Sequence, residues 1–432
     1  MENYTIVLII MALMIGASGI ATRLKIPAPL FLLLIGMAAG CWEKAAAIQI
    51  NPEIIMLLFL PPLLYDAAFN ISFEDFKTNG NTIGTLAIGL VFLTTAGIAA
   101  IAYYLIPGMT WALAFLLGSI LSSTDAVAAI GITKGLGLPK KTTTILEGES
   151  LVNDASALVA YRFAVAAVTG IAFVFKQALL QFLIVLGGGF LIGMITARLL
   201  AYVLRYFRNN DMVVICLMLL MPFVVYLVAE HYKVSGVIAV VVLGLGMSRL
   251  SKEKFPDTIK DQSRHFWDVI IFLLNGLIFL LIGLEFPLLL KTMSASTVWP
   301  YIGYAAIITI ATLAIRMVRV YLQQFNLQKA FQGNHNPNRG NTPNRRRNKR
   351  KISEDALFDS RTSFIITWSG MRGIVSLAIA IGLPTTLEDG APFPMRNEII
   401  FLSIVVVLIS ILGQGTTLPW IIKKLQKPVP QT

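Results

Sequence analysis

Long apolar runs, separated by short polar segments, recur along almost the whole chain. A helix needs about 20 apolar residues to cross a bilayer, and Pro, Gly and charged residues bound these runs. The pattern therefore predicts an all-α polytopic membrane protein with about 13 transmembrane helices, of which the second and ninth are short. The predicted helices cover residues 5–22, 28–42, 52–69, 82–104, 111–132, 144–170, 177–203, 211–229, 235–250, 265–290, 298–323, 362–384 and 397–422.

The composition supports this class. Of the 432 residues, 56% are hydrophobic and only 13% are charged. Soluble domains are about 45–50% apolar and about 25% charged. A soluble fold of this length could not bury so much apolar surface, so lipid must be the solvent for most of the chain.

Basic residues alternate from loop to loop. Lys and Arg accumulate in cytoplasmic loops, and one missed helix would scramble the alternation from that point onward. One set of alternate loops holds Arg23, Lys25, Lys77, Lys134, Lys140, Lys141, Arg205, Arg208, Arg249, Lys252, Lys254, Lys260 and Arg264. The opposite loops hold Lys44, Lys176, Lys233, Lys291 and Arg396. The pattern predicts an N-terminus outside the plasma membrane and a C-terminus in the cytoplasm.

The odd number of helices suggests an inverted repeat. If the first six and last six helices are two repeats joined by the seventh, they enter the membrane in opposite orientations. Transporters of this layout bind their substrate where paired broken helices meet near the midplane. The sequence shows no strong self-similarity, so this repeat is a hypothesis from topology.

The chain divides into one transmembrane transporter domain (1–323 and 362–423), a basic cytoplasmic loop (324–361) and a short cytoplasmic tail (424–432). The loop contains NHNPNRGNTPNRRRNKRK (334–351), which lacks apolar periodicity and is predicted to be disordered. It is either a solvated loop or a contact for anionic lipid headgroups. Nucleic-acid binding is not favoured despite the +12 net charge, because no folded basic face is expected.

Neither a cofactor nor a metal cluster is expected. Cys41 and Cys216 both lie in apolar runs, which disfavours a disulfide. The three histidines (His231, His265 and His335) are far apart and form no HExxH motif, so a zinc site is not predicted.

The sixth predicted helix carries the densest set of polar residues, EGESLVNDASALV (147–159). Residues four apart share a helix face, so Ser150 lies over Asp154 and Glu149 over Asn153. Asp154 is about ten residues from the cytoplasmic start of its helix, or about 15 Å, which is near the midplane. Ionisable groups at that depth are costly and are functional candidates.

The fifth and twelfth helices are predicted to be broken. The fifth contains LSSTDAVAAIG (121–131), where a row of hydroxyl residues before Asp125 offers the backbone competing hydrogen bonds. In the twelfth, Arg372 lies between Gly370 and Gly373. Unwound backbone is tolerated at this depth only where it lines a cavity.

The intramembrane charges come close to balancing. The acidic residues are Asp66, Asp125, Glu149 and Asp154, and the basic ones expected to face them are Arg316 and Arg372. Glu149 and Arg316 are interpreted as a pair that holds the fold. Asp154 has a hydroxyl and an amide but no basic residue as helix neighbours, so it is the candidate working carboxylate.

Five motifs, in order along the whole chain, resemble the bacterial branch of the electroneutral sodium/proton exchanger family, within the monovalent cation:proton antiporters. They are STDAVA (123–128), EGESLVNDASALV (147–159), FLLNGLIFLLIGLE (272–285), IRMVRVYL (315–322) and SGMRGIVSLA (369–378). The resemblance implies a six-helix core around two crossed interrupted helices. It also implies a dimerisation domain that makes a homodimer.

The resemblance also implies roles for individual residues. The implied ion- and proton-binding residues are Asp154, Asn153, Ser150, Thr124, Asp125 and Asp66. Glu149 and Arg316 fall on the structural pair, and Arg372 on the arginine of the second interrupted helix. The chain departs from the pattern at Asp66, where relatives often carry Glu, and at Ala126, where many carry Pro.

These features predict a secondary active antiporter, not an enzyme, that exchanges Na⁺ or Li⁺ for H⁺ and serves pH homeostasis. Na⁺ would bind the Asp154 carboxylate, the Ser150 hydroxyl, the Thr124 carbonyl and Asp66, and a proton would compete for Asp154. No GxxxxGK[ST] motif for ATP is present. Electrogenic relatives carry two adjacent aspartates where this chain has Asn153 before Asp154, so one H⁺ is expected per Na⁺, with alternating access.

Three alternatives are compared with this reading. K⁺/H⁺ exchange by the same mechanism is the nearest rival, because ligand type alone does not separate Na⁺, Li⁺ and K⁺. A cation channel would also explain polar residues at the midplane. An intramembrane aspartyl protease would need a GxGD partner for Tyr65-Asp66, and the chain has none.

Overall fold

The computed structural model describes residues 2–24, 28–41, 52–133, 136, 138, 140–170, 175–207, 210–334, 359–387 and 390–425. Within these residues the fold is helical, apart from one isolated β-bridge between Thr386 and Pro392. The predicted all-α class is therefore confirmed. The residues 335–358 of the basic loop and 426–432 of the tail lie outside the described residues.

Every predicted membrane range overlaps one helix of the structure or two in series. The helices are α1 (Glu2–Leu24), α2 (Ala28–Gly40), α4 (Pro52–Asn70), α5 (Phe73–Gly84), α6 (Leu90–Leu105), α7 (Trp111–Ser122), α8 (Ala126–Thr133), α9 (Lys140–Val168), α10 (Phe175–Tyr206), α11 (Asp211–His231), α12 (Gly236–Lys254), α13 (Asp257–Thr292), α14 (Ala295–Asn334), α15 (Ser360–Trp368), α16 (Ile374–Ile381), α17 (Arg396–Ser410) and α18 (Thr416–Leu425). Single π-helical turns, η1 (Thr85–Gly89) and η3 (Ile411–Gly415), join α5 to α6 and α17 to α18.

The chain has 7 helical segments in its described part that are long and apolar enough to cross a membrane. Shorter apolar segments occur in α1, α2, α4, α7 and α12. The count of about 13 spans stays a prediction.

One predicted boundary is wrong. The basic loop was expected to begin at residue 324, but α14 continues to Asn334. The extra turns contain Leu, Gln, Lys and Ala, which are good helix formers. They are also anchored, because Leu327 is buried and Gln324 accepts a hydrogen bond of 2.7 Å from the Ser363 hydroxyl on α15.

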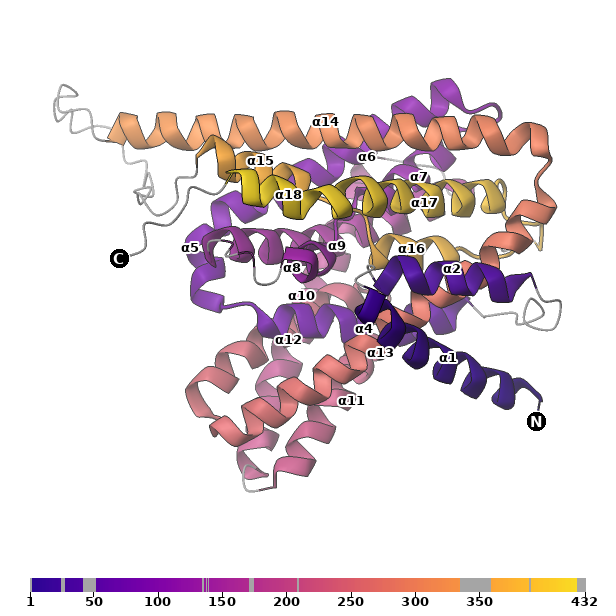
Figure 1. Ribbon diagram of the computed structural model, residues 1–432. Coiled ribbons are helices and arrows are strands. Elements are labelled where there is room, and N and C mark those ends of the chain that lie inside the picture. The colour runs from indigo at the N-terminus through magenta and orange to yellow at the C-terminus, as the bar shows by residue number, and fades with distance from the viewer. Residues whose placement is uncertain are drawn as a thin grey trace.

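The helices pack as two groups (Figure 1). The crossing group contains α5 to α9 and α14 to α18, and α14 lies along its upper edge in the figure. The flanking group contains α1, α2, α4 and α10 to α13. The two groups meet where α4 and α13 lie against α16, and α4 and α12 against α9.

The packing agrees with the inverted repeat. In the hypothesis the second span corresponds to the ninth and the third to the tenth. The second span, α2, packs along the tenth, α13, and the ninth, α12, packs along the third, α4. Exchanging each helix for its repeat partner turns one pair into the other. The α2–α13 approach is so close that a Cβ on Gly36 would come within 2.9 Å of the Gly283 Cα, as small-residue packing in membranes permits.

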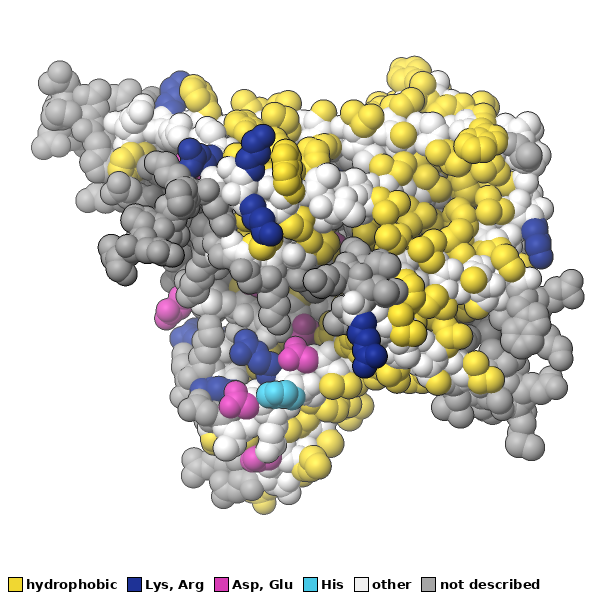
Figure 2. All heavy atoms as spheres, in the orientation of Figure 1, with side chains coloured by type: hydrophobic (Ala, Val, Ile, Leu, Met, Phe, Trp, Pro, Cys, Tyr) yellow, Lys and Arg dark blue, Asp and Glu magenta, His cyan; other side chains and the backbone are white. Residues whose placement is uncertain are grey.

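The surface is that of a membrane protein. Large apolar side chains are exposed along α10 and α14, including Ile195 at 60% and Ile310 at 69%. Figure 2 shows such side chains over much of the described surface, while most Lys and Arg side chains gather toward the side where α18 ends. The helix α1 begins at the opposite side of the bundle (Figure 1). This arrangement agrees with the predicted odd number of spans, and which side faces the cytoplasm stays a prediction.

Candidate functional site

Two helices are interrupted in the middle of the crossing group, as predicted. The first stops at Ser122, continues as extended backbone, with Ser123 at φ −65° and ψ 141°, and resumes as α8 at Ala126. The second stops at Trp368 and resumes as α16 at Ile374. Both breaks fall where the sequence supplies hydroxyl residues or glycines that favour non-helical backbone.

The two breaks cross and are hydrogen-bonded to each other. The Asp125 backbone N–H donates to the Met371 carbonyl at 2.8 Å. The Arg372 guanidinium donates through Nη1 to the Ser123 carbonyl at 2.9 Å. Close approach requires glycine at Gly373, because a Cβ there would overlap the Asp125 carboxylate.

Asp125 caps the N-termini of both resumed half-helices. Its Oδ1 accepts from the Ala128 N–H at 3.0 Å in α8, and its Oδ2 accepts from the Ile374 N–H at 3.3 Å in α16. Each helix N-terminus carries about half a positive charge, so two of them sum to about one. A single carboxylate therefore neutralises both ends. The sequence prediction of Asp125 as an ion-binding residue did not foresee this capping role.

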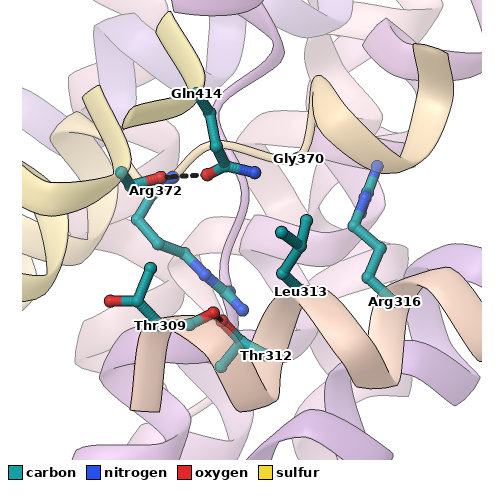
Figure 3. A pocket seen from close by; sticks show the side chains of 8 residues that line it. Thr309, Thr312, Leu313, Arg316, Gly370, Arg372 and Gln414 are labelled. Atoms are coloured by element: carbon teal, nitrogen blue, oxygen red, sulfur yellow. Dashed lines mark hydrogen bonds between the residues drawn. The ribbon is translucent and has the colours of Figure 1, made fainter. Parts of the chain in front are cut away.

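The C-terminal ends of α7 and α15 are bound by hydrogen-bond donors. Their last carbonyls carry partial negative charge and need donors. Arg372 donates to the Ser123 carbonyl at the end of α7, and the Gln414 amide donates to the Trp368 carbonyl of α15 at 3.2 Å. Gln414 lies on the π-helical turn η3, and its Oε1 accepts a hydrogen bond from the Ser410 hydroxyl (Figure 3).

A small cavity lies behind this crossing. Figure 3 shows the Arg372 side chain extending from the break toward Thr312 of α14, with Arg316 one helical turn away. The cavity measures about 10 Å³, roughly the room for one water molecule. Its lining residues are Thr309, Thr312, Leu313, Arg316, Gly370, Arg372, Ser410 and Gln414.

Glu149 and Arg316 form the buried pair that the sequence predicted. The contact is bidentate: Arg316 Nη2 donates to Glu149 Oε2 at 2.9 Å, and Nη1 donates to Oε1. Both residues are buried, at 1% and 3% exposure. Arg316 also donates to the Ile366 carbonyl of α15 through Nε at 3.2 Å and Nη2 at 3.0 Å. The pair thus joins α9, α14 and α15.

Asp154 faces the first break from α9. Its Oδ1 accepts a hydrogen bond from the Ser123 hydroxyl. Its side chain is buried at 8% exposure, and no Lys or Arg of the described residues forms an ion pair with it. Among the residues that the structure describes, no fixed cation therefore balances the carboxylate charge.

Ser150 and Asn153 hold the unwound backbone beside Asp154. The Ser150 hydroxyl donates to the Thr124 carbonyl at 2.9 Å and accepts from the Ala126 N–H at 3.3 Å. The Asn153 amide donates to the Thr124 hydroxyl at 3.2 Å. These bonds position the break against α9, and Asn153 itself is completely buried.

A larger cavity, about 50 Å³, opens at Asp154 between the two helix groups. One water needs about 10–15 Å³, so a cation with a few waters fits. The lining residues are Leu63, Leu64, Asp66, Ala67, Ser123, Asp125, Ser150, Asp154, Ile271, Asn275, Ile374 and Val375.

The structure thus brings together Asp154, Ser150, Asp125 and Asp66 from the predicted ion-binding set. Asp66 lies on the opposite wall, where its Oδ1 accepts from the Asn70 amide at 2.9 Å. Thr124 and Asn153 are not among the residues that line this cavity, although both lie directly behind the Asp154 wall.

The sequence analysis assigned no site role to several polar residues that the structure places at the site. Ser123 lies next to the predicted Thr124-Asp125 pair, and Asn275 is the lone amide of the FLLNG motif. Ser410 and Gln414 are isolated polar residues in an apolar run. Polarity in an apolar run was the available signal for all of them.

Nearly the whole chain is similar to known proteins. Residues 8–424 match the transmembrane sodium/hydrogen exchanger family. A sodium, potassium, lithium and rubidium/H⁺ antiporter of Bacillus pumilus is 34% identical over 99% of this chain, which spans 63% of that protein. The Na⁺/H⁺ antiporter NhaH of Halobacillus aidingensis is 30% identical, with 97% of both chains covered.

The fold has a solved counterpart. The sodium proton antiporter MjNhaP1 from Methanocaldococcus jannaschii superimposes with a TM-score of 0.73 over 98% of this chain and 99% of the other. The two sequences are 18% identical, so this likeness concerns the fold alone.

Proposed function

Because this chain belongs to the sodium/hydrogen exchanger family, a family of membrane transporters, we propose that it exchanges Na⁺ or Li⁺ for H⁺ at the Asp154 cavity. The observation that carries the proposal is a buried carboxylate with a hydroxyl donor and no ion-pair partner among the described residues, at the edge of a cavity large enough for a small cation. A buried carboxylate without a partner is costly. A mobile cation or a proton removes that cost.

Competition at one carboxylate couples the two ions. Asp154 binds either Na⁺ or a proton, and each expels the other. Na⁺ is a hard cation that prefers oxygen ligands, and the cavity offers the Asp154 and Asp66 carboxylates and the Ser150 hydroxyl. The Thr124 carbonyl accepts from Ser150, and it takes part only if its second lone pair reaches the ion.

The same geometry supports an electroneutral 1:1 exchange. Asn153 occupies the position where electrogenic antiporters carry a second aspartate. Its amide does not take up a proton in the physiological range, and it donates to the Thr124 hydroxyl. Both oxygens of Asp125 accept from backbone N–H groups of the half-helices. Asp154 is therefore the one carboxylate of the crossing group that is assigned to carry ions.

The position of the cavity supports alternating access. One wall belongs to the crossing group and the other to the flanking group, through α4 and α13. A movement of one group against the other would expose Asp154 to each side in turn. If movement requires Asp154 to be neutralised, neither ion leaks without the other.

The proposal includes the setting of the protein. It would lie in the plasma membrane, with the N-terminus outside and the C-terminus in the cytoplasm, and would support pH homeostasis. It would form a homodimer through the flanking group, which leaves the crossing group free to move.

The test is proton movement in proteoliposomes that contain the full chain, reported by a pH-sensitive dye after addition of Na⁺, Li⁺ or K⁺. We expect Na⁺ and Li⁺ to dissipate the proton gradient and Asp154→Asn to abolish the response. A membrane-potential dye should report no voltage. Asp154→Glu, which keeps the carboxylate, is the matched control and should retain exchange with altered cation affinity.

The outcomes separate the parts of the proposal. If Asp154→Asn exchanges at the wild-type rate, Asp154 is not the carrier. If transport generates a voltage, the 1:1 stoichiometry is wrong. If only K⁺ is exchanged, the mechanism stands with a different substrate, and the Bacillus pumilus relative is named for potassium as well as sodium.

A further inference from the structure

The cavity at Asp154 has a polar group that the ion-binding set leaves out. Asn275 lies on α13 and lines the cavity from the flanking wall. Apolar residues surround it along its helix, in a segment long and apolar enough to cross a membrane. A polar side chain at such a place is costly and is a candidate for a functional position.

The Asn275 side-chain oxygen is buried and has no hydrogen-bond partner among the described residues. Buried polar atoms are almost always paired in native proteins, and an exception calls for a missing water, ion or ligand. Its neighbour on the same wall differs in this respect, because Asp66 accepts a hydrogen bond from Asn70. Among the described residues, the amide oxygen of Asn275 thus lacks a donor, whereas Asp66 on the same wall has one.

Building on the proposed exchange at Asp154, we propose that Asn275 is a specificity-determining ligand, whose amide oxygen coordinates the transported cation from the flanking wall. In a cavity of about 50 Å³ a cation keeps only a few waters, so a fixed carbonyl oxygen replaces one of them. Selectivity among Na⁺, Li⁺ and K⁺ depends on the number and field strength of such oxygen dipoles. The carboxylate supplies the charge and Asn275 supplies the second side of the coordination shell.

An amide differs from a carboxylate in one decisive way. It ligates Na⁺ through oxygen, but it does not take up a proton in the physiological range. Asn275 therefore favours the cation in its competition with the proton at Asp154. Losing it should weaken cation binding, leave proton binding at Asp154 in place, and shift the pH dependence of exchange.

The experiment compares wild type with Asn275→Leu and Asn275→Asp in proteoliposomes. Asn275→Leu should raise the KM for Na⁺ about tenfold, the loss expected for one polar contact to a charged group, with little change in the maximal rate. At subsaturating Na⁺ its activity should shift to higher pH, because the proton competes better, and saturating Na⁺ should restore the profile. The order of KM values for Na⁺, Li⁺ and K⁺ should also change.

Asn275→Asp keeps the size and polarity of the side chain, so it tests the proposal even if Asn275→Leu fails to fold. The added carboxylate should lower the KM for Na⁺ at alkaline pH and steepen the pH dependence, because it now binds protons as well. The matched control is Asn397→Leu, which removes an amide of the first turn of α17 that donates to Thr292, away from the cavity. This control should keep the wild-type KM.

Equilibrium Na⁺ binding to the purified protein, measured by calorimetry, separates the two proposals. If wild type binds Na⁺ without exchanging it, the proposed function fails, while weaker binding by Asn275→Leu still supports the ligand assignment. If wild type exchanges and Asn275→Leu keeps its KM, its cation order and its pH profile, the assignment of Asn275 is overturned. If wild type neither binds nor exchanges any of the three cations, both proposals fall.

Discussion

Because Asp125 caps two half-helices, its substitution should affect stability in a way that substitution of Asp154 does not. Asp125 accepts one backbone N–H from each half-helix, and the substitution Asp125→Asn keeps only one acceptor oxygen. The other N–H then faces an NH₂ group. One hydrogen bond to a charged acceptor is lost, worth about 1.5–3 kcal/mol. About one positive charge, the sum of two helix N-termini, is also left without its counter-charge.

We therefore expect Asp125→Asn to lower the free energy of unfolding by at least about 1.5–3 kcal/mol and to impair exchange. Asp154→Asn should behave in the opposite way. It removes a buried charge that has no ion-pair partner among the described residues and retains an oxygen that accepts from Ser123. Its free energy of unfolding should equal or exceed that of wild type, while exchange is lost.

The assay is denaturant unfolding of the two variants and wild type in the same detergent, followed by tryptophan fluorescence, with exchange measured on the same preparations. Asp125→Glu serves as a control, because it keeps the charge but changes the reach of the carboxylate. If Asp125→Asn is inactive yet as stable as wild type, the carboxylate acts as an ion ligand and the capping argument is refuted. If Asp154→Asn is strongly destabilised, its charge has a fixed structural partner.

Three further changes test the crossing and its surroundings. Gly373→Ala places a Cβ against the carboxylate that caps the half-helix, and the thermal midpoint and exchange rate should both fall; unchanged values would show that the breaks can separate. Glu149→Gln leaves Arg316 as a buried cation and should cost about 3–5 kcal/mol of unfolding free energy, which Arg316→Met added to it should partly restore. An ion pair between Arg162 and Glu230, whose side chains are 33% and 32% exposed, links α9 to α11 and should contribute at most about 1 kcal/mol to the free energy of unfolding. If this link must open in each transport cycle, Glu230→Gln should raise the maximal exchange rate; an unchanged rate would mean that the link stays closed.

Local chemistry made the breaks predictable from the sequence. Ser122 to Asp125 compete with the helix backbone for hydrogen bonds, and the glycines around Arg372 favour unwinding, so both interruptions could be placed within a few residues. The Glu149–Arg316 pair was predictable for a similar reason, because two opposite charges in apolar runs need each other.

The sharing of one carboxylate by two half-helices could not be predicted in this way. Asp125 and Ile374 are 249 positions apart, and only the crossing in space brings the second N-terminus to the side chain. The role of Gln414 has the same origin, because a π-helical turn aims it at the end of α15. Asn275 was not predicted because its side chain is uncharged, whereas Asp66 on the same wall was singled out by its charge in an apolar run.

The contacts of the four helix ends at the crossing explain why Asp154 differs from the other charged residues there. Asp125 neutralises the two N-termini. Arg372 donates to the C-terminal end of α7, and Arg316 and Gln414 donate to the last carbonyls of α15. Arg316 in turn is paired with Glu149. Each of these charges has a fixed partner within the fold, so the crossing does not need an ion to hold it together.

Asp154 differs because its contact with the crossing is a neutral hydroxyl. The Ser123 carbonyl is held by Arg372, and the hydroxyl of the same residue donates to Asp154. The carboxylate is thus positioned without being neutralised. An ion-exchange site requires a buried charge that is held in place but has no fixed counter-charge. A fixed counter-charge would remove the need for either Na⁺ or a proton. On this argument, supplying Asp154 with a permanent cation, as Ser150→Lys would do, should abolish exchange even though Asp154 is intact, whereas Ser150→Met, which removes the same hydroxyl without adding a charge, should retain more of it.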